Sequence, residues 1–253
     1  MSTSKGEKIN RLLQKIPSGT VILSSWLVQQ GYSHDLQQKY IRSQWLTPIG
    51  RGAYKRTGDE ITIYGGLYAL EKQTNKNVHI GGLSALDLQG YAHYIAITEK
   101  PVQLYADEKF KLPSWFKNYN WTTPYTLKTT RLSAPDYALV SYNFNAYGLN
   151  ITSPTQAMLQ CLDLVPDEMD MEQAWYLMES MNNLIPAQAQ KLLEQCPSIK
   201  AKRLFLFFAE KAGHKWFKYL DINKINLGTG KLSIVKNGTY IKKYKITVPK
   251  TLS

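Results

Sequence analysis

Residues 23–56 have the sequence LSSWLVQQGYSHDLQQKYIRSQWLTPIGRGAYKR, which carries signals for two short helices followed by a hairpin. The first helix is predicted to begin at Ser24 or the next residue, because a serine hydroxyl can accept from the free N–H groups of a first helical turn. Gly31 stands where a left-handed residue ends a helix. Ser33 is placed to cap a second helix, predicted over His34–Trp45. Such a short connection between two helices is typical of a helix-turn-helix.

The predicted second helix is amphipathic. On a wheel of about 100° per residue, one half is apolar and should pack on the body of the domain: Leu36, Tyr40, Ile41 and Trp45. The other half is polar and contains Asp35, Gln38, Lys39, Arg42 and Ser43. Arg, Lys and Gln side chains pair with base edges in the major groove of DNA. We therefore predict that this helix presents a DNA-binding face made of Gln38, Lys39, Arg42 and Ser43, in which Asp35 would be a misfit that repels phosphate.

A basic turn follows the second helix. Residues 46–56 contain Pro48, Gly50 and Gly52, which favour a hairpin. We predict a wing whose cations lie along the phosphate backbone and add affinity without sequence information: Arg51, Lys55 and Arg56. Together the segments predict a winged helix-turn-helix that binds duplex DNA. Two alternatives stay open, since amphipathic helices with a charged turn occur in many domains and many winged helices bind only proteins.

Composition sets limits on the rest of the chain. Its 253 residues are long for one domain and suggest two or three units. No run of 18 or more apolar residues is present, so no membrane span is expected. The polar, basic N-terminal residues lack the apolar core of a secretory signal. We therefore expect a cytoplasmic protein in which Cys161 and Cys196 are reduced, packed thiols.

The net charge of +12 is unevenly distributed. Residues 1–78 carry 11 Lys and Arg against 5 Asp and Glu, and residues 79–150 carry 6 against 5. Residues 151–196 carry 1 against 7, whereas residues 197–253 carry 13 against 2. Two basic regions therefore flank a neutral and an acidic stretch. Basic regions attract polyanions, although a solvated charged surface explains the second region equally well.

The periodicity predicts an α+β protein. An N-terminal winged helix-turn-helix domain, residues 1–78, includes a first helix over Lys5–Ile16 and a later helix over Asp59–Thr74 that Gly65-Gly66 interrupts. The C-terminal domain, residues 79–253, is predicted to be mixed α/β, with a small sheet, a helical region and a final hairpin. Its strand-rich part spans residues 79–150, and its helical part spans residues 151–253.

Within the C-terminal domain, a short helix is predicted over Ser84–Gln89, ending at Gly90. Four segments have strand-like length and composition: residues 93–98, 102–106, 125–133 and 137–144. Four helices follow, over residues 153–164, 171–184, 186–196 and 198–211, the last ended by Gly213. The final hairpin is predicted over Lys231–Val248, with its turn at Asn237-Gly238.

The order of these motifs resembles a known family. WLTPIGRGAYKR, HIGGLSALDLQGYAHYI, LPSWF, KRLFLFFAEKAGHKWFKYLD and GKLSIVKNGTYIKKYKITVPK follow the helix-turn-helix in the order found in AbiE-type antitoxins of bacteria. The resemblance covers about Lys5 to Lys250. It implies a transcriptional regulator from a two-gene type IV toxin–antitoxin operon linked to phage defence by abortive infection.

The resemblance implies two functions and two partners. The winged helix would bind inverted repeats in the operon's own promoter and repress it. The C-terminal domain would oppose a nucleotidyltransferase-like toxin without forming a stable complex with it. A possible antitoxin surface lies in the basic C-terminal region: Lys200, Lys202, Arg203, Lys215, Lys218, Lys242, Lys243 and Lys245. Periodicity and charge support only the DNA-binding half of this reading.

Catalytic motifs are scarce. His34, His79, His93 and His214 are scattered without a His or Cys at metal-ligand spacing, so each is predicted to be structural. Gly228-Thr229-Gly230-Lys231 lacks the full phosphate-loop pattern and is predicted to be a turn. Asp107-Glu108-Lys109 has the Asp-x-Lys element of many nucleases but no acidic partner at strand spacing. We expect no enzyme activity, no cofactor and no metal.

Two other functions remain possible from the residues alone. The chain could be a winged-helix interaction protein whose basic C-terminal region binds RNA or an acidic partner, because aromatic and cationic residues interleave there. It could also be a nucleic-acid-processing enzyme with unrecognised residues.

Overall fold

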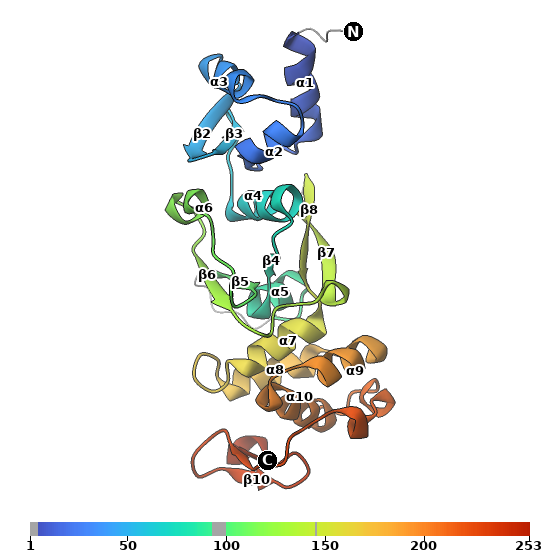
Figure 1. The fold of residues 1–253 in the computed structure, drawn as a ribbon. Helices are drawn as coiled ribbons and strands as arrows, with labels where there is room; N and C mark the ends of the chain where they lie inside the picture. Colours follow the sequence, from blue (N-terminus) through green and yellow to red (C-terminus); the bar gives the residue numbers. More distant parts are fainter. Residues whose placement is uncertain (1–4, 93–99, 145) are drawn as a thin grey trace.

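The computed structural model describes residues 5–92, 100–144 and 146–253. The elements are stacked along one long axis in nearly the order of the sequence (Figure 1). The helix-turn-helix lies at the N-terminal end, a five-stranded sheet lies in the middle, and a helical layer with a small sheet forms the C-terminal end. The predicted α+β class, with a winged helix before a mixed α/β region, is confirmed.

The N-terminal unit is a winged helix-turn-helix. Its elements are α1 (Lys5–Lys15), β1 (Ile22–Leu23), α2 (Ser24–Gln29), α3 (His34–Arg42), β2 (Leu46–Gly50) and β3 (Ala53–Arg56). The strands form an antiparallel sheet in the order β1-β3-β2. Its core is a separate apolar cluster made of Ile9, Leu12, Ile16, Ile22, Leu27, Tyr32, Tyr40, Leu46 and Tyr54. The predicted first helix and hairpin are confirmed.

The helix-turn-helix differs from the prediction at its end. Gly31 has φ 85° and Ser33 Oγ accepts from the Leu36 N–H at 3.4 Å, as predicted. However, α3 ends at Arg42, and Gln44 takes a left-handed φ of 57°. Because the helix stops early, Trp45 no longer follows the apolar stripe. Its side chain is 45% exposed, so the prediction that it packs on the body of the domain is wrong.

A helix joins this unit to the middle of the chain. It consists of α4 (Ile63–Tyr68) and a π-helical turn, η1 (Ala69–Gln73). The predicted interruption at Gly65-Gly66 is wrong, since both glycines lie inside α4. They permit close packing instead: a Cβ on Gly65 would overlap the Gly19 carbonyl oxygen, and one on Gly66 would lie 2.7 Å from the Trp121 ring.

The middle unit is a mixed sheet in the order β6-β5-β4-β8-β7. Its elements are β4 (Val78–Ile80), α5 (Gly82–Leu88), β5 (Val102–Ala106), α6 (Ser114–Asn118), β6 (Tyr125–Thr129), η2 (Asp136–Ala138), β7 (Leu139–Phe144) and β8 (Tyr147–Thr152). Strand β4 pairs antiparallel with β5 and parallel with β8. The predicted strand over residues 93–98 lies outside the described residues, and β8 was not predicted.

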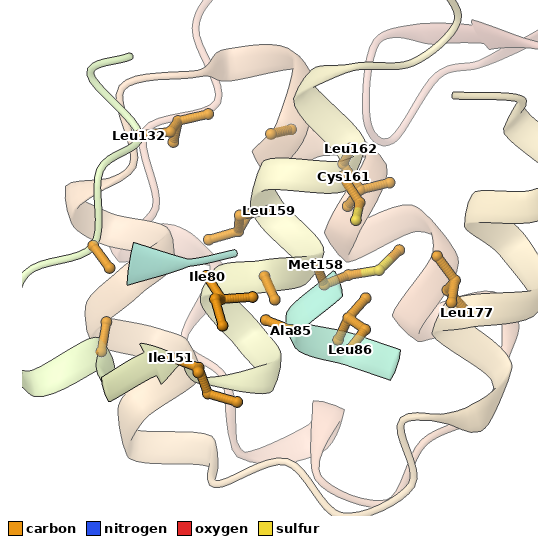
Figure 2. Close-up of a cluster of buried hydrophobic side chains, with 14 of the residues drawn as sticks. Ile80, Ala85, Leu86, Leu132, Ile151, Met158, Leu159, Cys161, Leu162 and Leu177 are labelled. Carbon is orange, nitrogen blue, oxygen red and sulfur yellow. The ribbon is translucent and has the colours of Figure 1, made fainter. Parts of the chain in front are cut away.

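The helical layer packs against one end of the sheet (Figure 1). It contains α7 (Pro154–Asp163), α8 (Met171–Ser180), α9 (Pro186–Gln195) and α10 (Ile199–Lys211), all close to the predicted bounds. Figure 2 shows side chains of α7, among them Met158 and Leu159, beside Ile80, Ala85, Leu86 and Ile151 of the middle unit. One continuous apolar core therefore spans the sheet and the helices.

The C-terminal residues form a small sheet of β9 (Leu232–Ser233), β10 (Thr239–Ile241) and β11 (Ile246–Val248), flanked by the short helices η3 (Phe217–Tyr219), η4 (Ile222–Lys224) and η5 (Lys250–Leu252). The predicted pairing is wrong. Strand β9 pairs in parallel with β11, and the hairpin is β10–β11. Asn237 does turn the chain with φ 57°, but the strand after this turn, β10, pairs with β11 and not with β9.

The predicted boundary after residue 78 falls at the start of β4. Apolar side chains before it, including Ile63, Leu67 and Leu70, belong to the same core as the sheet and α7. Glu71 also accepts from the Asn150 N–H of β8 at 3.0 Å. The helix before the boundary is therefore packed as part of the middle unit. None of the helices in the described ranges has the length and apolar character needed to cross a membrane.

Candidate nucleic-acid interface

The position of α3 is fixed by a buried glutamine that the sequence analysis did not single out. Gln37 has no exposed surface. Its Nε2 donates to the Tyr32 carbonyl oxygen at 2.9 Å and to the Ser24 carbonyl oxygen at 3.3 Å. The Ser24 hydroxyl donates back to Gln37 Oε1 at 2.7 Å. These bonds tie α3 to α2 and to the turn between them, which sets the orientation of the opposite face.

The opposite face of α3 is open to solvent. The four residues predicted to contact DNA are all exposed and lie together on it: Gln38, Lys39, Arg42 and Ser43. Arg42 Nε donates only a long 3.4 Å bond to the Gln38 carbonyl oxygen. The guanidinium can thus turn toward a ligand at little cost. Asp35 is exposed in the first turn, where its negative charge interacts favourably with the helix dipole.

The tip of the β2–β3 hairpin lies against the middle unit. Arg51 is exposed at this tip, between Gly50 and the left-handed Gly52 with φ 71°. The backbone of Gly50 packs directly on α6, because a Cβ there would lie 2.9 Å from Trp115 Cβ. The wing is therefore held in place by the body of the protein.

The other two predicted wing cations lie at the far end of β3 and have protein partners. Lys55 Nζ donates to the Asp59 carbonyl oxygen at 2.7 Å. The Arg56 guanidinium donates to the carbonyl oxygens of Leu13 and Ile16 at the end of α1. The structure therefore separates Arg51 from Lys55 and Arg56. Arg56 satisfies helix carbonyls, which leaves it poorly placed to contact phosphate.

Two cations of α1 lie near the helix-turn-helix and were missed. Lys8 and Arg11 are exposed. The Tyr32 hydroxyl donates to the Lys8 carbonyl oxygen at 3.2 Å. Burial raises the pKa of Tyr32, and the positive charge of Arg11 lowers it, which places Arg11 close to the turn before α3. The apolar stripe of α1 was the available signal, since it turns the basic face outward.

The basic C-terminal residues do not form one surface. Lys202 and Arg203 are buried, and Lys200 donates to the Val165 carbonyl oxygen. Arg203 donates to the carbonyl oxygens of Leu227 at 2.6 Å, Gly230 at 2.8 Å and Lys245 at 3.1 Å. Lys202 and Arg203 therefore do not belong to an open basic surface. Arg203 holds the C-terminal sheet on α10, and Lys200 bonds to the segment after α7.

The other five predicted C-terminal cations differ in availability. Lys215, Lys218 and Lys242 are exposed. Lys243 pairs with Glu210, and Lys245 donates to the Thr229 carbonyl oxygen at 3.4 Å. The exposed lysines come from two separate segments, one after α10 and one after β10.

Two of the described histidines, His79 and His214, are buried and hydrogen-bonded to the main chain. His79 is buried, and desolvation lowers its pKa to about 4 while its Nε2 accepts from the Ala134 N–H at 3.3 Å. His214 Nε2 lies 2.7 Å from the Met178 carbonyl oxygen. His34 is exposed, with Nδ1 3.4 Å from the Ser24 hydroxyl. His93 lies outside the described residues.

The cysteines are buried, unpaired thiols, as predicted. Burial raises the pKa of Cys161, and it raises that of Cys196 to about 11. Among the described residues, no cluster of three His, Cys, Asp or Glu side chains could hold a metal ion. Gly228 to Lys231 form the predicted loop before β9, and the Gly230 carbonyl serves Arg203.

Comparison with known structures agrees with this architecture. A crystal structure of the RV2827C protein from Mycobacterium tuberculosis has a similar fold, with a TM-score of 0.60 and 14% sequence identity. The similarity covers 95% of this chain and 89% of that chain. A search of curated proteins gives no match.

Two family models match the chain. Residues 5–97 match the N-terminal domain of the AbiEi antitoxin, a transcriptional regulator, and residues 99–249 match the AbiEi antitoxin of type IV toxin–antitoxin systems. Together they extend over the winged helix, the sheet, the helical layer and the C-terminal sheet. The chain therefore belongs to the AbiEi family of transcriptional regulators, the antitoxins of type IV toxin–antitoxin systems.

Proposed function

We propose that this chain represses its own toxin–antitoxin operon by binding inverted repeats in the promoter through α3. Gln38, Lys39, Arg42 and Ser43 would contact base edges, and Arg51 would contact phosphate. The observation that carries the proposal is the exposed polar face of α3. It lies opposite the buried Gln37 side chain, whose hydrogen bonds fix α3 to α2 and the turn. A recognition helix needs this combination of fixed orientation and free side chains.

Two half-sites require two recognition helices. They can be supplied by a dimer or by two monomers that bind side by side, and the number of chains bound per operator distinguishes these cases. Lys8 and Arg11, exposed beside the turn before α3, add to the positive charge of this end of the molecule.

The second part of the proposal is antitoxicity. The C-terminal region from β4 onward would neutralise a nucleotidyltransferase-like toxin in the cytoplasm, without a stable complex. The family membership supports this role. The exposed lysines Lys215, Lys218 and Lys242 are the candidates for its basic surface, because the other five cations predicted for that surface are buried or bonded within the protein.

A separation of the two functions in cells tests the proposal. The parent chain and Arg42→Ala are expressed beside a promoter–reporter fusion and, separately, beside the neighbouring toxin gene. We expect Arg42→Ala to release the reporter from repression while it still protects cells from the toxin. Lys215→Ala serves as a control that keeps repression.

Two results contradict the proposal. Full repression by Arg42→Ala would show that the operator is not recognised through Arg42 of α3. Death of cells that express the folded parent chain together with the toxin would remove the antitoxin role. Purified, folded variants with parental circular dichroism are required for both readings.

A further inference from the structure

A groove of about 700 Å³ begins at α3 and extends onto the middle unit. On one side it is lined by α2 and by His34, the first residue of α3. On the other side it is lined by Lys76, Pro113 and Trp115, with Arg51 of the wing tip also in the lining. The groove is therefore shared by the winged helix and the sheet-bearing unit.

The groove is positively charged. Arg51 and Lys76 both line it and are exposed, and none of its lining residues is Asp or Glu. The Lys76 ammonium lies 5.7 Å from the centre of the Phe110 ring. Exposed Lys111 comes directly after Phe110 and two residues before Pro113. Arg51 and Lys76 therefore line the groove, and Lys111 follows the residue whose ring the Lys76 ammonium contacts.

Asp107 and Glu108, the acidic residues nearest to Lys111 in sequence, have partners outside the groove lining. Asp107 accepts from the Ser133 hydroxyl. Glu108 accepts from Arg131 Nε at 3.1 Å, in an exposed ion pair. The two carboxylates of the Asp107-Glu108-Lys109 motif are therefore engaged with the loop around residues 131–133, and Asp107 also accepts from the Asn77 side-chain amide at 3.5 Å. Neither Asp107 nor Glu108 forms an ion pair with Lys76 or Lys111.

The two walls of the groove are fixed relative to each other. The Gly50 backbone packs against Trp115, and Gln73 accepts from the Leu23 N–H at 2.8 Å and donates to the Val21 carbonyl oxygen at 2.7 Å. Gln73 closes the helical segment that precedes Lys76. The spacing between α3, Arg51 and Lys76 is thereby set by the protein before any ligand binds.

We propose that duplex DNA occupies this groove, so that Arg51, Lys76 and Lys111 contact backbone phosphates beyond the base pairs that α3 reads. The proposal rests on the proposed function and extends its footprint onto the middle unit. The groove favours a phosphate backbone because it starts at the recognition helix, is lined by cations without acids, and is open along its length. The rigid connection makes one continuous interface out of two units.

The test compares salt dependence in the full chain. Each neutralised phosphate contributes roughly 0.9 to the slope of log K against log salt. The double variant Lys76→Ala/Lys111→Ala should lower the slope on operator DNA by about 2 and leave the preference for operator over unrelated duplex unchanged. The matched control is Lys236→Ala/Lys250→Ala, which removes two exposed lysines at the C-terminal end. Hydroxyl-radical footprinting should show protection flanking each half-site that the groove variant loses and the control keeps.

Three outcomes oppose the inference. An unchanged slope and footprint in the groove variant, with specific binding lost in Arg42→Ala, would overturn the groove and leave the proposed function standing. Equal losses of slope in the groove and control variants would show a general charge effect and would also overturn it. If the Arg42→Ala and groove variants both bind as the parent does, the proposed function and the groove fail together.

Discussion

The side-chain amide of Gln37 donates a 2.9 Å hydrogen bond to the main-chain carbonyl oxygen of Tyr32. This bond spans the turn of the helix-turn-helix and is buried. Its neighbour in the sequence, Gln38, points to solvent from the same helix. Adjacent glutamines therefore serve different purposes, and the pair offers a direct comparison between a positioning residue and a candidate DNA contact.

Gln37→Ala should lower the free energy of unfolding by about 1–3 kcal/mol, because it leaves the buried carbonyl oxygen of Tyr32 without this partner. Gln38→Ala should change stability by less than about 0.5 kcal/mol, since its side chain is exposed. Urea denaturation measures both values. Equal stability of the two variants would show that the Gln37 clamp does not hold the motif together.

Arg42→Ala should weaken binding to operator DNA by about 1–3 kcal/mol if the guanidinium reads a base. Arg51→Ala should weaken all duplexes alike and lower the salt slope by about 1, because a phosphate contact carries no sequence information. Titrations on operator and unrelated duplexes at several salt concentrations separate the two effects. A uniform loss in Arg42→Ala would assign Arg42 to the backbone instead.

Arg56→Ala should act on stability rather than on DNA. It removes the donor for the Leu13 and Ile16 carbonyl oxygens, and we expect a loss of about 1–3 kcal/mol in the free energy of unfolding. The folded variant should keep the parental salt slope, in contrast to Arg51→Ala. A reduced salt slope with an unchanged free energy of unfolding would show that Arg56 contacts phosphate.

Arg203→Met should destabilise the C-terminal sheet. The change leaves the carbonyl oxygens of Leu227, Gly230 and Lys245 without their charged donor, and roughly 3 kcal/mol of stability should be lost. Antitoxicity should fall with stability. Lys236→Ala is the control, because it removes an exposed charge of the same region with no expected change in melting temperature or antitoxicity.

Acidification should destabilise the middle unit through His79. Desolvation lowers its folded-state pKa to about 4, below the usual value of 6.5. As the pH falls from 6.5 toward 4, His79 becomes protonated in the unfolded state but stays neutral in the folded state. The free energy of unfolding therefore decreases over this window. The loss amounts to roughly 3 kcal/mol at its full extent. His79→Gln, which can still accept from the Ala134 N–H, should flatten the dependence of stability on pH in this window.

Local signals predicted much of the fold. The Ser33 cap, the left-handed Gly31 and the apolar stripe of the first helix are encoded within a few residues, and the structure confirms them. The Ser-Pro start of α7 and the Gly213 stop of α10 belong to the same class of signal. Such features depend on backbone geometry that neighbouring residues determine by themselves.

Partners far apart in the sequence could not be predicted. Arg56 and Arg203 have the charge of surface residues, but their carbonyl partners lie up to 43 and 42 residues away in sequence. Gly65 carries a turn signal but serves close packing on Gly19. The β9–β11 pairing likewise depends on how α10 and Arg203 hold the tail. Neither the charge nor the periodicity of the sequence predicts these tertiary contacts.

The most direct test of the central claim is a gel shift of the purified chain on the DNA just upstream of its own gene, at two salt concentrations and with an unrelated duplex as competitor. The account predicts a retarded complex that survives competition at both salt concentrations and is lost with Arg42→Ala. Equal binding to both duplexes that disappears at the higher salt concentration would contradict it. The chain would then be a basic nucleic-acid binder whose α3 does not read sequence.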